Sequence, residues 1–255
     1  MMSHKSSKYL ALGGMLILLV LYGITNAGLL GDNPVGSTSR DTSPLIVPAG
    51  YAFAIWGPIY LGLIAFPIYQ LIKGRENHPA WIPLRKWYTF NVIANGVWLV
   101  FASYSWQWLT VAVITTMLVS LFRINALLIK IKADGADYNY WLERLVFSLY
   151  FAWITLATAL NISSALAYYN WDGWGLSEVS WTMIISVVAA LVAGTTALKY
   201  KDVAYAGVVV WAFAALAVRH YEGNSSLAYL ALTIVVVFLP LIISLIRKNN
   251  YANLS

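Results

Sequence analysis

The 255-residue chain has no cysteine and few charged side chains, and both absences narrow what it can be. Without cysteine it forms no disulfide, no thiolate metal site and no thiol nucleophile. Charged residues make up 10% of the chain, whereas an average soluble protein has about 25%. So few charges do not cover a water-facing surface, and 60% of the residues are hydrophobic. The composition therefore predicts an all-α integral membrane protein with several spans.

Catalytic side chains are also missing from the apolar parts of the chain. All ten carboxylates and all three histidines, His4, His78 and His220, fall in loops or at the ends of apolar runs. No metal-ligand cluster, nucleophile motif or phosphate-binding loop is present. The sequence therefore predicts no catalytic residue, no metal ligand and no required cofactor. A buried proton relay or carboxylate ion site is disfavoured, because such sites use acids inside the membrane.

Eight apolar runs approach the roughly 20 residues that cross about 30 Å of hydrocarbon. They are residues 9–30, 51–72, 87–105, 108–129, 143–168, 180–198, 203–218 and 226–246. The first run, which follows two lysines, also fits a cleaved signal peptide, and that reading is the alternative for this segment. The longest outer loop, 31–50, is rich in Gly, Pro and Ser and is long enough to fold over a cavity mouth.

The basic residues favour eight crossings. With the N-terminus inside, thirteen Lys and Arg fall on the inner side, while Arg40 and Arg219 fall on the outer side and Arg123 lies within the fourth run. The thirteen are Lys5, Lys8, Lys73, Arg75, Arg85, Lys86, Lys130, Lys132, Arg144, Lys199, Lys201, Arg247 and Lys248. This bias predicts a multi-pass protein with both termini cytoplasmic. The membrane that we expect it to occupy is a bacterial plasma (inner) membrane. The net charge of +6 then sets topology and does not indicate nucleic-acid binding.

Three of the runs carry stripes that mix aromatic rings with amides or a hydroxyl at helical spacing. The stripes are Phe53, Trp56 and Tyr60; Asn91, Asn95 and Trp98; and Trp153, Ala157, Leu160 and Asn161. At 1.5 Å per residue they overlap in the outer half of the bilayer. Polar groups at that depth face a bundle interior or a cavity.

These stripes predict one ligand-binding site in the membrane. Its predicted residues are Phe53, Trp56, Tyr60, Asn95, Trp98, Trp153, Ala157 and Asn161. A neutral, aromatic and amide-lined site suits a flat and largely apolar ligand. The alternative is structural, because Asn joins transmembrane helices by hydrogen bonds and Trp collects at membrane interfaces.

The same stripes carry a family resemblance. The stretch WITLATALN (153–161) resembles the W-x-x-x-A-T-x-L-N signature in the fifth helix of the TspO/MBR family, the tryptophan-rich sensory proteins and translocator proteins. NGVW (95–98) and PAGYAFAIWGPIYLGL (48–63) resemble that family's third-helix and second-helix motifs. The resemblance implies a five-helix bundle over residues 1–172, often a homodimer, with residues 173–255 as a three-helix C-terminal extension.

The resemblance also implies a site under the first loop that binds tetrapyrroles, steroids and synthetic ligands. The leading interpretation is therefore a membrane-embedded sensor or regulator of planar hydrophobic molecules such as porphyrins or haem. Two alternatives stay open. One is a transporter of tetrapyrrole- or sterol-like molecules, and the other is a light-dependent porphyrin-degrading enzyme using Trp56, Trp98 and Trp153. Because no acid–base set is present, a non-enzymatic role is favoured.

Overall fold

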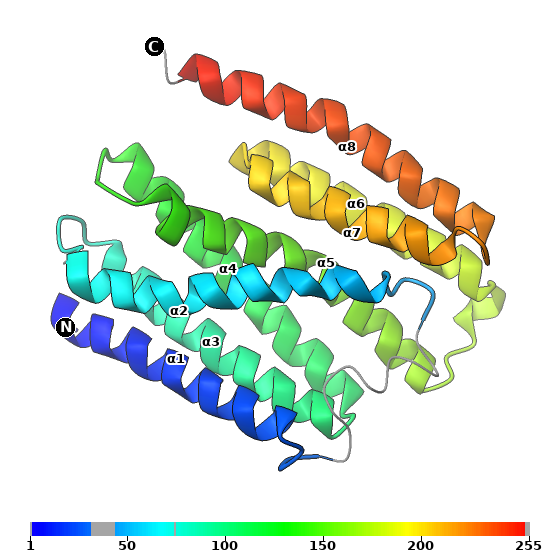
Figure 1. Cartoon of the computed structure of the whole chain (residues 1–255), viewed down its shortest axis with the longest axis horizontal. Helices are drawn as coiled ribbons and strands as arrows, with labels where there is room; N and C mark the ends of the chain where they lie inside the picture. The colour runs from blue at the N-terminus through cyan, green and yellow to red at the C-terminus, as the bar shows by residue number, and fades with distance from the viewer. Residues whose placement is uncertain (1, 32–43, 74, 253–255) are drawn as a thin grey trace. The chain divides into compact units, whose positions relative to one another are not determined.

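The computed structural model describes residues 2–31, 44–73 and 75–252, and over these residues it contains eight long α-helices (Figure 1). They are α1 (His4–Asn26), α2 (Trp56–Lys73), α3 (Trp81–Ser103), α4 (Gln107–Ala133), α5 (Val146–Tyr168), α6 (Glu178–Tyr200), α7 (Val203–His220) and α8 (Ser225–Ala252). Two 3₁₀ turns, η1 (Gly50–Ile55) and η3 (Gly173–Gly175), and one π-helical turn, η2 (Tyr140–Leu145), complete the set. The predicted all-α fold is confirmed. Residues 32–43 of the predicted outer loop lie outside the described residues.

Seven of these helices are long and apolar enough to cross a membrane, counting only the described residues. The chain is therefore a multi-pass helical membrane protein, and lipid is its partner. The exception is α3, which corresponds to the predicted run 87–105 and is 23 residues long. Its charged Arg85 and Lys86 and its amides Asn91 and Asn95 lower its hydropathy. Whether α3 also crosses stays a prediction.

The first helix begins and ends earlier than the apolar run suggested. The run was read as 9–30, but α1 spans His4–Asn26. Its first turn is stabilised by Ser3, whose side-chain oxygen accepts a hydrogen bond from the backbone N–H of Ser6 at 3.1 Å. The helix ends before Gly28, which has φ +69. Hydropathy missed both ends because capping depends on local hydrogen bonds and not on apolar character.

Contacts between Cα atoms divide the chain into two compact units. The first contains residues 1–41 and 56–154, and in it α3 packs against both α1 and α4. Helices α2 and α5 approach closely where Gly62 faces Val146, since a Cβ on Gly62 would lie 2.3 Å from Val146 Cγ2. Only glycine fits there, and this close approach brings the aromatic side chains of the two helices together.

The second unit contains residues 42–55 and 155–255. Its helices α6, α7 and α8 pack on one another, and η1 packs on α7. The boundaries of the units differ from the predicted division at residue 172. The division at residue 172 was based on the resemblance to a family and not on compactness, and it stays a prediction.

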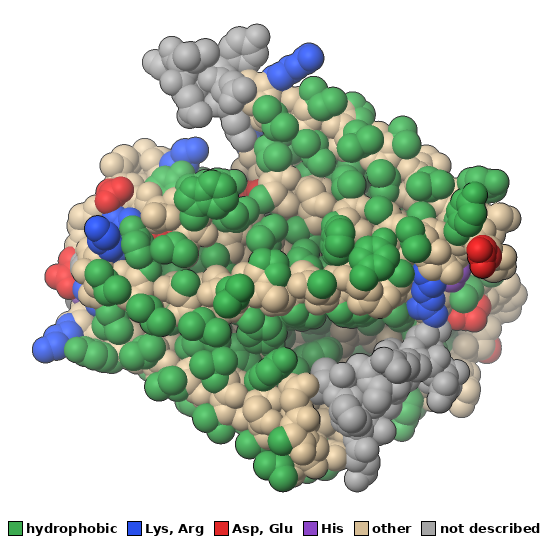
Figure 2. Space-filling view, viewed as in Figure 1, with side chains coloured by type: hydrophobic (Ala, Val, Ile, Leu, Met, Phe, Trp, Pro, Cys, Tyr) green, Lys and Arg blue, Asp and Glu red, His purple; other side chains and the backbone are tan. Residues whose placement is uncertain are grey.

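The surfaces of the helices fit a lipid environment. Large apolar side chains are exposed along them, including Val20 on α1, Leu191 on α6 and Val236 on α8, each more than 60% exposed. In the view of Figure 2, hydrophobic side chains cover the length of the helices and charged side chains gather near the helix ends. Exposed apolar surface of this extent is expected for membrane-spanning helices, whose solvent is hydrocarbon.

Candidate functional site

A buried hydrogen-bond network joins three helices of the first unit at the predicted site. The hydroxyl of Tyr60 on α2 donates to Oδ1 of Asn95 on α3 at 3.0 Å. The amide Nδ2 of Asn95 donates to the hydroxyl oxygen of Tyr150 on α5 at 2.6 Å. Asn95 and Tyr150 are buried, at 1% and 0% exposure. The amide of Asn95, which we predicted from the sequence to lie in the membrane, is therefore satisfied by two tyrosines from neighbouring helices.

Aromatic rings pack around this network. The ring of Trp56 lies 5.4 Å from that of Tyr60, 5.9 Å from that of Tyr150 and 6.3 Å from that of Trp153, measured between ring centroids. The contacts with Tyr150 and Trp153 are edge-to-face, a favoured geometry for aromatic pairs. We call Trp56, Tyr60, Asn95, Tyr150 and Trp153 the aromatic–amide cluster. Trp56 and Tyr60 are half-buried, whereas Asn95, Tyr150 and Trp153 are buried.

The structure therefore brings together four predicted site residues: Trp56, Tyr60, Asn95 and Trp153. A fifth, Trp98, is half-buried one turn after Asn95 on α3. The other three belong to the second unit. Phe53 lies in η1 and is 38% exposed. On α5, the side chain of Asn161 donates to the carbonyl oxygen of Ala157 at 2.9 Å, so this amide bonds to its own helix.

Two tyrosines at the site were not among the site residues predicted from the sequence. Tyr150 precedes Trp153 by three residues, and that helical spacing signals a shared face. Tyr22 on α1 has its ring 5.4 Å from the ring of Tyr60, and nothing in the first apolar run marks it out. Conversely, Asn91 belongs to the α3–α4 contact, because its Nδ2 donates to the carbonyl oxygen of Met117 and to Ser120 Oγ. Asn91 therefore has a structural role: it joins two helices by hydrogen bonds, as the alternative interpretation of the stripes proposed.

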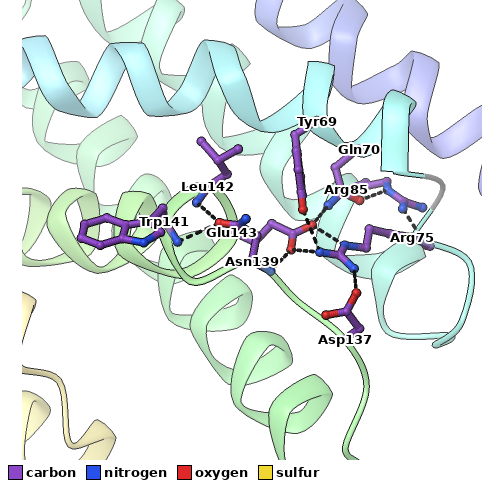
Figure 3. Close-up of polar contacts among 9 residues, drawn as sticks. All are labelled: Tyr69, Gln70, Arg75, Arg85, Asp137, Asn139, Trp141, Leu142 and Glu143. Carbon is purple, nitrogen blue, oxygen red and sulfur yellow. Dashed lines mark hydrogen bonds and ion pairs between the residues drawn. The ribbon is translucent and has the colours of Figure 1, made fainter.

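A second polar group lies at the other end of α2, where it meets α3 and η2 (Figure 3). Glu143, in the π-helical turn, is fully buried. It accepts two hydrogen bonds from Arg75, through Nε and NH2, each 3.0 Å long. It also accepts hydrogen bonds from Gln70 Nε2 and from the backbone N–H of Asn139. This arrangement satisfies a carboxylate that would otherwise be costly to bury.

The same group contains a second arginine. Arg85 on α3 is fully buried, and its Nε donates to Gln70 Oε1 at 2.8 Å. Its NH2 donates to the carbonyl oxygen of Arg75 at 2.8 Å. Asp137 forms a further ion pair with Arg75. We call Gln70, Arg75, Arg85, Asp137 and Glu143 the arginine–glutamate cluster.

Ion pairs at this end of the helices shift the pKa values of the groups that form them. Burial lowers the pKa of Arg75, but its hydrogen bonds to Glu143 and Asp137 outweigh that effect and raise the pKa above its ordinary value. Just beyond α4, hydrogen bonds from Lys130 and then His78 lower the pKa of the Asp134 carboxyl. The acids and bases here bond to one another and tie α2, α3, α4 and η2 together. These residues therefore have a structural role, which is to hold the helices together.

From the sequence, the charged residues of the arginine–glutamate cluster were expected at the ends of the spans, but their burial was not predicted. Glu143 opens the fifth apolar run and was read as a carboxylate at a span end, and Arg85 precedes the third run and was counted among the basic residues that set topology. A signal existed in Gln70, a polar residue near the end of the second run. Its partners could not be read, because they lie 15 and 73 residues away.

These features define a multi-pass helical membrane protein whose helices meet around a buried aromatic–amide cluster. The chain belongs to the TSPO-like protein family, whose profile matches residues 8–244. The matched range includes α6 and α7 and runs into α8, so it does not mark these helices off as a separate extension. No curated protein and no solved structure matched the chain.

Proposed function

We propose that this protein is a membrane-embedded sensor or regulator that binds planar hydrophobic molecules, such as porphyrins, at the aromatic–amide cluster. The observation that carries the proposal is the position of Asn95, which bridges Tyr60 and Tyr150 beside the rings of Trp56 and Trp153. Three helices contribute to this arrangement, so a ligand that contacts it would couple their positions. Membership of the TSPO-like family supports the same reading.

The geometry also favours a type of recognition. The side chain of Asn95 already bonds to a tyrosine through both its oxygen and its nitrogen, whereas Trp56 and Tyr60 are only half-buried. A ligand would therefore meet aromatic surface first and would bind by ring stacking and apolar contact. Flat apolar molecules gain most from such contact, and tetrapyrroles and sterols are the classes to test first.

The membrane arrangement belongs to the same proposal. Eight crossings place both termini in the cytoplasm and agree with the distribution of basic residues. α3 would be the eighth crossing, since it packs between α1 and α4, which are both candidate spans, and has the length to cross with them. Its low hydropathy is acceptable there because neighbouring helices shield it from lipid.

The test is a titration of the detergent-purified protein with haem, protoporphyrin and a sterol while tryptophan fluorescence is recorded. Trp56→Leu should weaken protoporphyrin binding about tenfold, the equivalent of roughly 1.4 kcal/mol. Trp141→Leu is the matched control, because Trp141 is 68% exposed on η2 and lies outside the cluster. Equal binding by both variants and the wild type would reject the cluster as the site.

A light-dependent reaction on a bound porphyrin is the second candidate, because the indole rings of Trp56 and Trp153 are in contact. Illumination of the protoporphyrin complex should then convert the porphyrin, and Trp153→Phe should slow that conversion more than it weakens binding. Binding without conversion favours the sensor. Flux of porphyrin across vesicles containing the protein would instead favour transport.

A further inference from the structure

Three tryptophans gather where the loop after α5 enters α6. The ring of Trp181, near the start of α6, lies 4.7 Å from that of Trp171 and 5.6 Å from that of Trp174, measured between ring centroids. The rings of Trp171 and Trp174 are 5.4 Å apart. We call these three residues the tryptophan platform, and all of them belong to the second compact unit. Trp171 and Trp181 are half-buried, whereas Trp174 is 77% exposed.

The loop is built to hold Trp174 in this exposed position. Its backbone has φ +51, in the left-handed region that is unfavourable for a bulky residue. Asp172 Oδ1 accepts a hydrogen bond from the backbone N–H of Trp174 at 3.0 Å, and the indole Nε1 of Trp181 donates to the carbonyl oxygen of Gly173. Gly173 has φ +66, and a Cβ on it would lie 3.0 Å from Cδ1 of Trp181, so glycine is needed here. The exposed indole is therefore part of an ordered turn.

The platform lies at a membrane surface and continues a lipid-facing stripe. α5 and α6 both belong to candidate spans, so the short loop between them lies where the two spans leave the hydrocarbon. Trp181 shares one face of α6 with Ile184, Val188 and Leu191, at i, i+3, i+7 and i+10. Those three apolar side chains are all exposed. Since indole rings prefer the interface between lipid and water, the platform fits the headgroup end of this stripe.

The charges around the platform favour one kind of headgroup. Between Tyr168 and Thr182 the charged residues are Asp172 and Glu178, and no Lys, Arg or His is present. Both carboxylates belong to exposed residues. Carboxylates repel anionic headgroups, whereas the faces of indole rings attract ammonium groups through cation–π interactions. Aromatic rings with acids and without bases therefore suit a zwitterionic lipid whose headgroup ends in an ammonium group.

We propose that the tryptophan platform is a docking surface for lipid headgroups that carry an ammonium group, such as phosphatidylcholine. It anchors the end of α5 and the start of α6 at the membrane surface. The indoles contact the headgroup and the adjoining part of the acyl chains, and the carboxylates disfavour anionic lipids. The proposal is independent of the proposed ligand site, because no residue of the aromatic–amide cluster takes part in it.

A fluorescent label beside the platform tests this proposal. The chain has no cysteine, so Leu176→Cys introduces a single thiol at an exposed position two residues after Trp174, and an environment-sensitive dye can be attached to it. In phosphatidylcholine vesicles the dye should emit at a shorter wavelength than in water. Lipids spin-labelled near the headgroup should quench it more than lipids spin-labelled near the chain end.

The matched control site is Glu222→Cys, because Glu222 is exposed in the turn after α7 and belongs to the same unit. A dye attached there should emit as in water and should be quenched weakly by both spin-labelled lipids. Equal emission from the two sites would overturn the docking surface.

Variants in the labelled Leu176→Cys background show whether the tryptophans are responsible. Trp174→Ala removes the exposed indole and should shift the dye emission toward its value in water. Gly173→Ala should do the same, because the added Cβ crowds the ring of Trp181. Tyr221→Ala removes another exposed ring of the same unit and should leave the emission unchanged. Unchanged emission in the Trp174→Ala variant, with a melting temperature equal to that of the wild type, would overturn the role of the platform.

Lipid composition and protein dilution identify the partner. In vesicles of anionic phosphatidylglycerol the dye should emit at a longer wavelength than in phosphatidylcholine vesicles, and equal emission in both would overturn the preference for an ammonium headgroup. Dilution of the protein in phosphatidylcholine vesicles should leave the emission unchanged. A shift toward the value in water on dilution would show that a second copy of the chain, and not lipid, covers the platform.

Discussion

Replacement of Glu143 by glutamine should destabilise the protein substantially. The carboxylate is fully buried and accepts two hydrogen bonds from Arg75, as well as one from Gln70 and one from the Asn139 backbone. Removing one partner of a buried ion pair costs about 3–5 kcal/mol, because the other charge is left uncompensated. Asp137 still pairs with Arg75, and the new amide still offers one oxygen, so the lower figure of about 3 kcal/mol applies.

The expected shift in melting temperature follows from the size of the chain. For proteins of roughly this length, 1 kcal/mol corresponds to about 2–4 °C, so Glu143→Gln should melt about 6–12 °C lower. The measurement is a thermal scan in one detergent at a fixed scan rate. Glu222→Gln makes the same chemical change at an exposed position after α7 and should leave the melting temperature unaltered.

A double-mutant cycle isolates the ion pair. Arg75→Gln alone should also destabilise, and Arg75→Gln combined with Glu143→Gln should cost less than the sum of the two single changes, because neither charge is then left unpaired. A melting temperature for Glu143→Gln within about 2 °C of wild type would refute the reasoning. Strict additivity of the two changes would show that the residues do not interact.

Four further predictions test the topology, the site and the charges. Reporter fusions after residues 78, 135, 200 and 255 should all report cytoplasmic, and a fusion after 172 that also did so would contradict eight crossings. Iron-free protoporphyrin should bind within about tenfold of haem, because no histidine belongs to the aromatic–amide cluster; a haem spectrum with a histidine ligand would contradict this. Ala157→Leu should lower ligand affinity several-fold without lowering the melting temperature, while Ala159→Leu, on another face of α5, should do neither; equal effects would reject the assignment of Ala157. The stabilising effect of Asp134, whose carboxyl has a lowered pKa, should be complete above its unfolded pKa near 4 and disappear as pH falls through its folded value. Melting scans of wild type and Asp134→Asn against pH measure this, and a gap between them that does not narrow on acidification would contradict it.

Much of the aromatic–amide cluster could be predicted from spacing. Trp56 and Tyr60 lie one turn apart, and the structure places both in the cluster as the stripe indicated. Spacing predicts a shared face, but it does not say which helix that face meets. Asn91 and Asn95 share one stripe, but the first bonds to α4 and the second to α2 and α5. The family motif, and not the spacing, singled out Asn95 as the site residue.

Helix number, the presence of membrane spans and the polar character of α3 were determined by the sequence itself. The reason is that hydrocarbon requires each spanning segment to satisfy its own backbone, which leaves a local signal of about 20 apolar residues. Only the tertiary structure decided the burial of Glu143 and Arg85 and the hydrogen bonding of residues 45–52 to α7. In each case a deciding partner lies far along the chain: Glu143 meets Gln70 across 73 residues, Arg85 meets Ser7 across 78, and Ala52 meets Trp211 across 159. A buried charge or carbonyl is tolerated only because a partner distant in the sequence bonds to it, and no local sequence pattern identifies that partner.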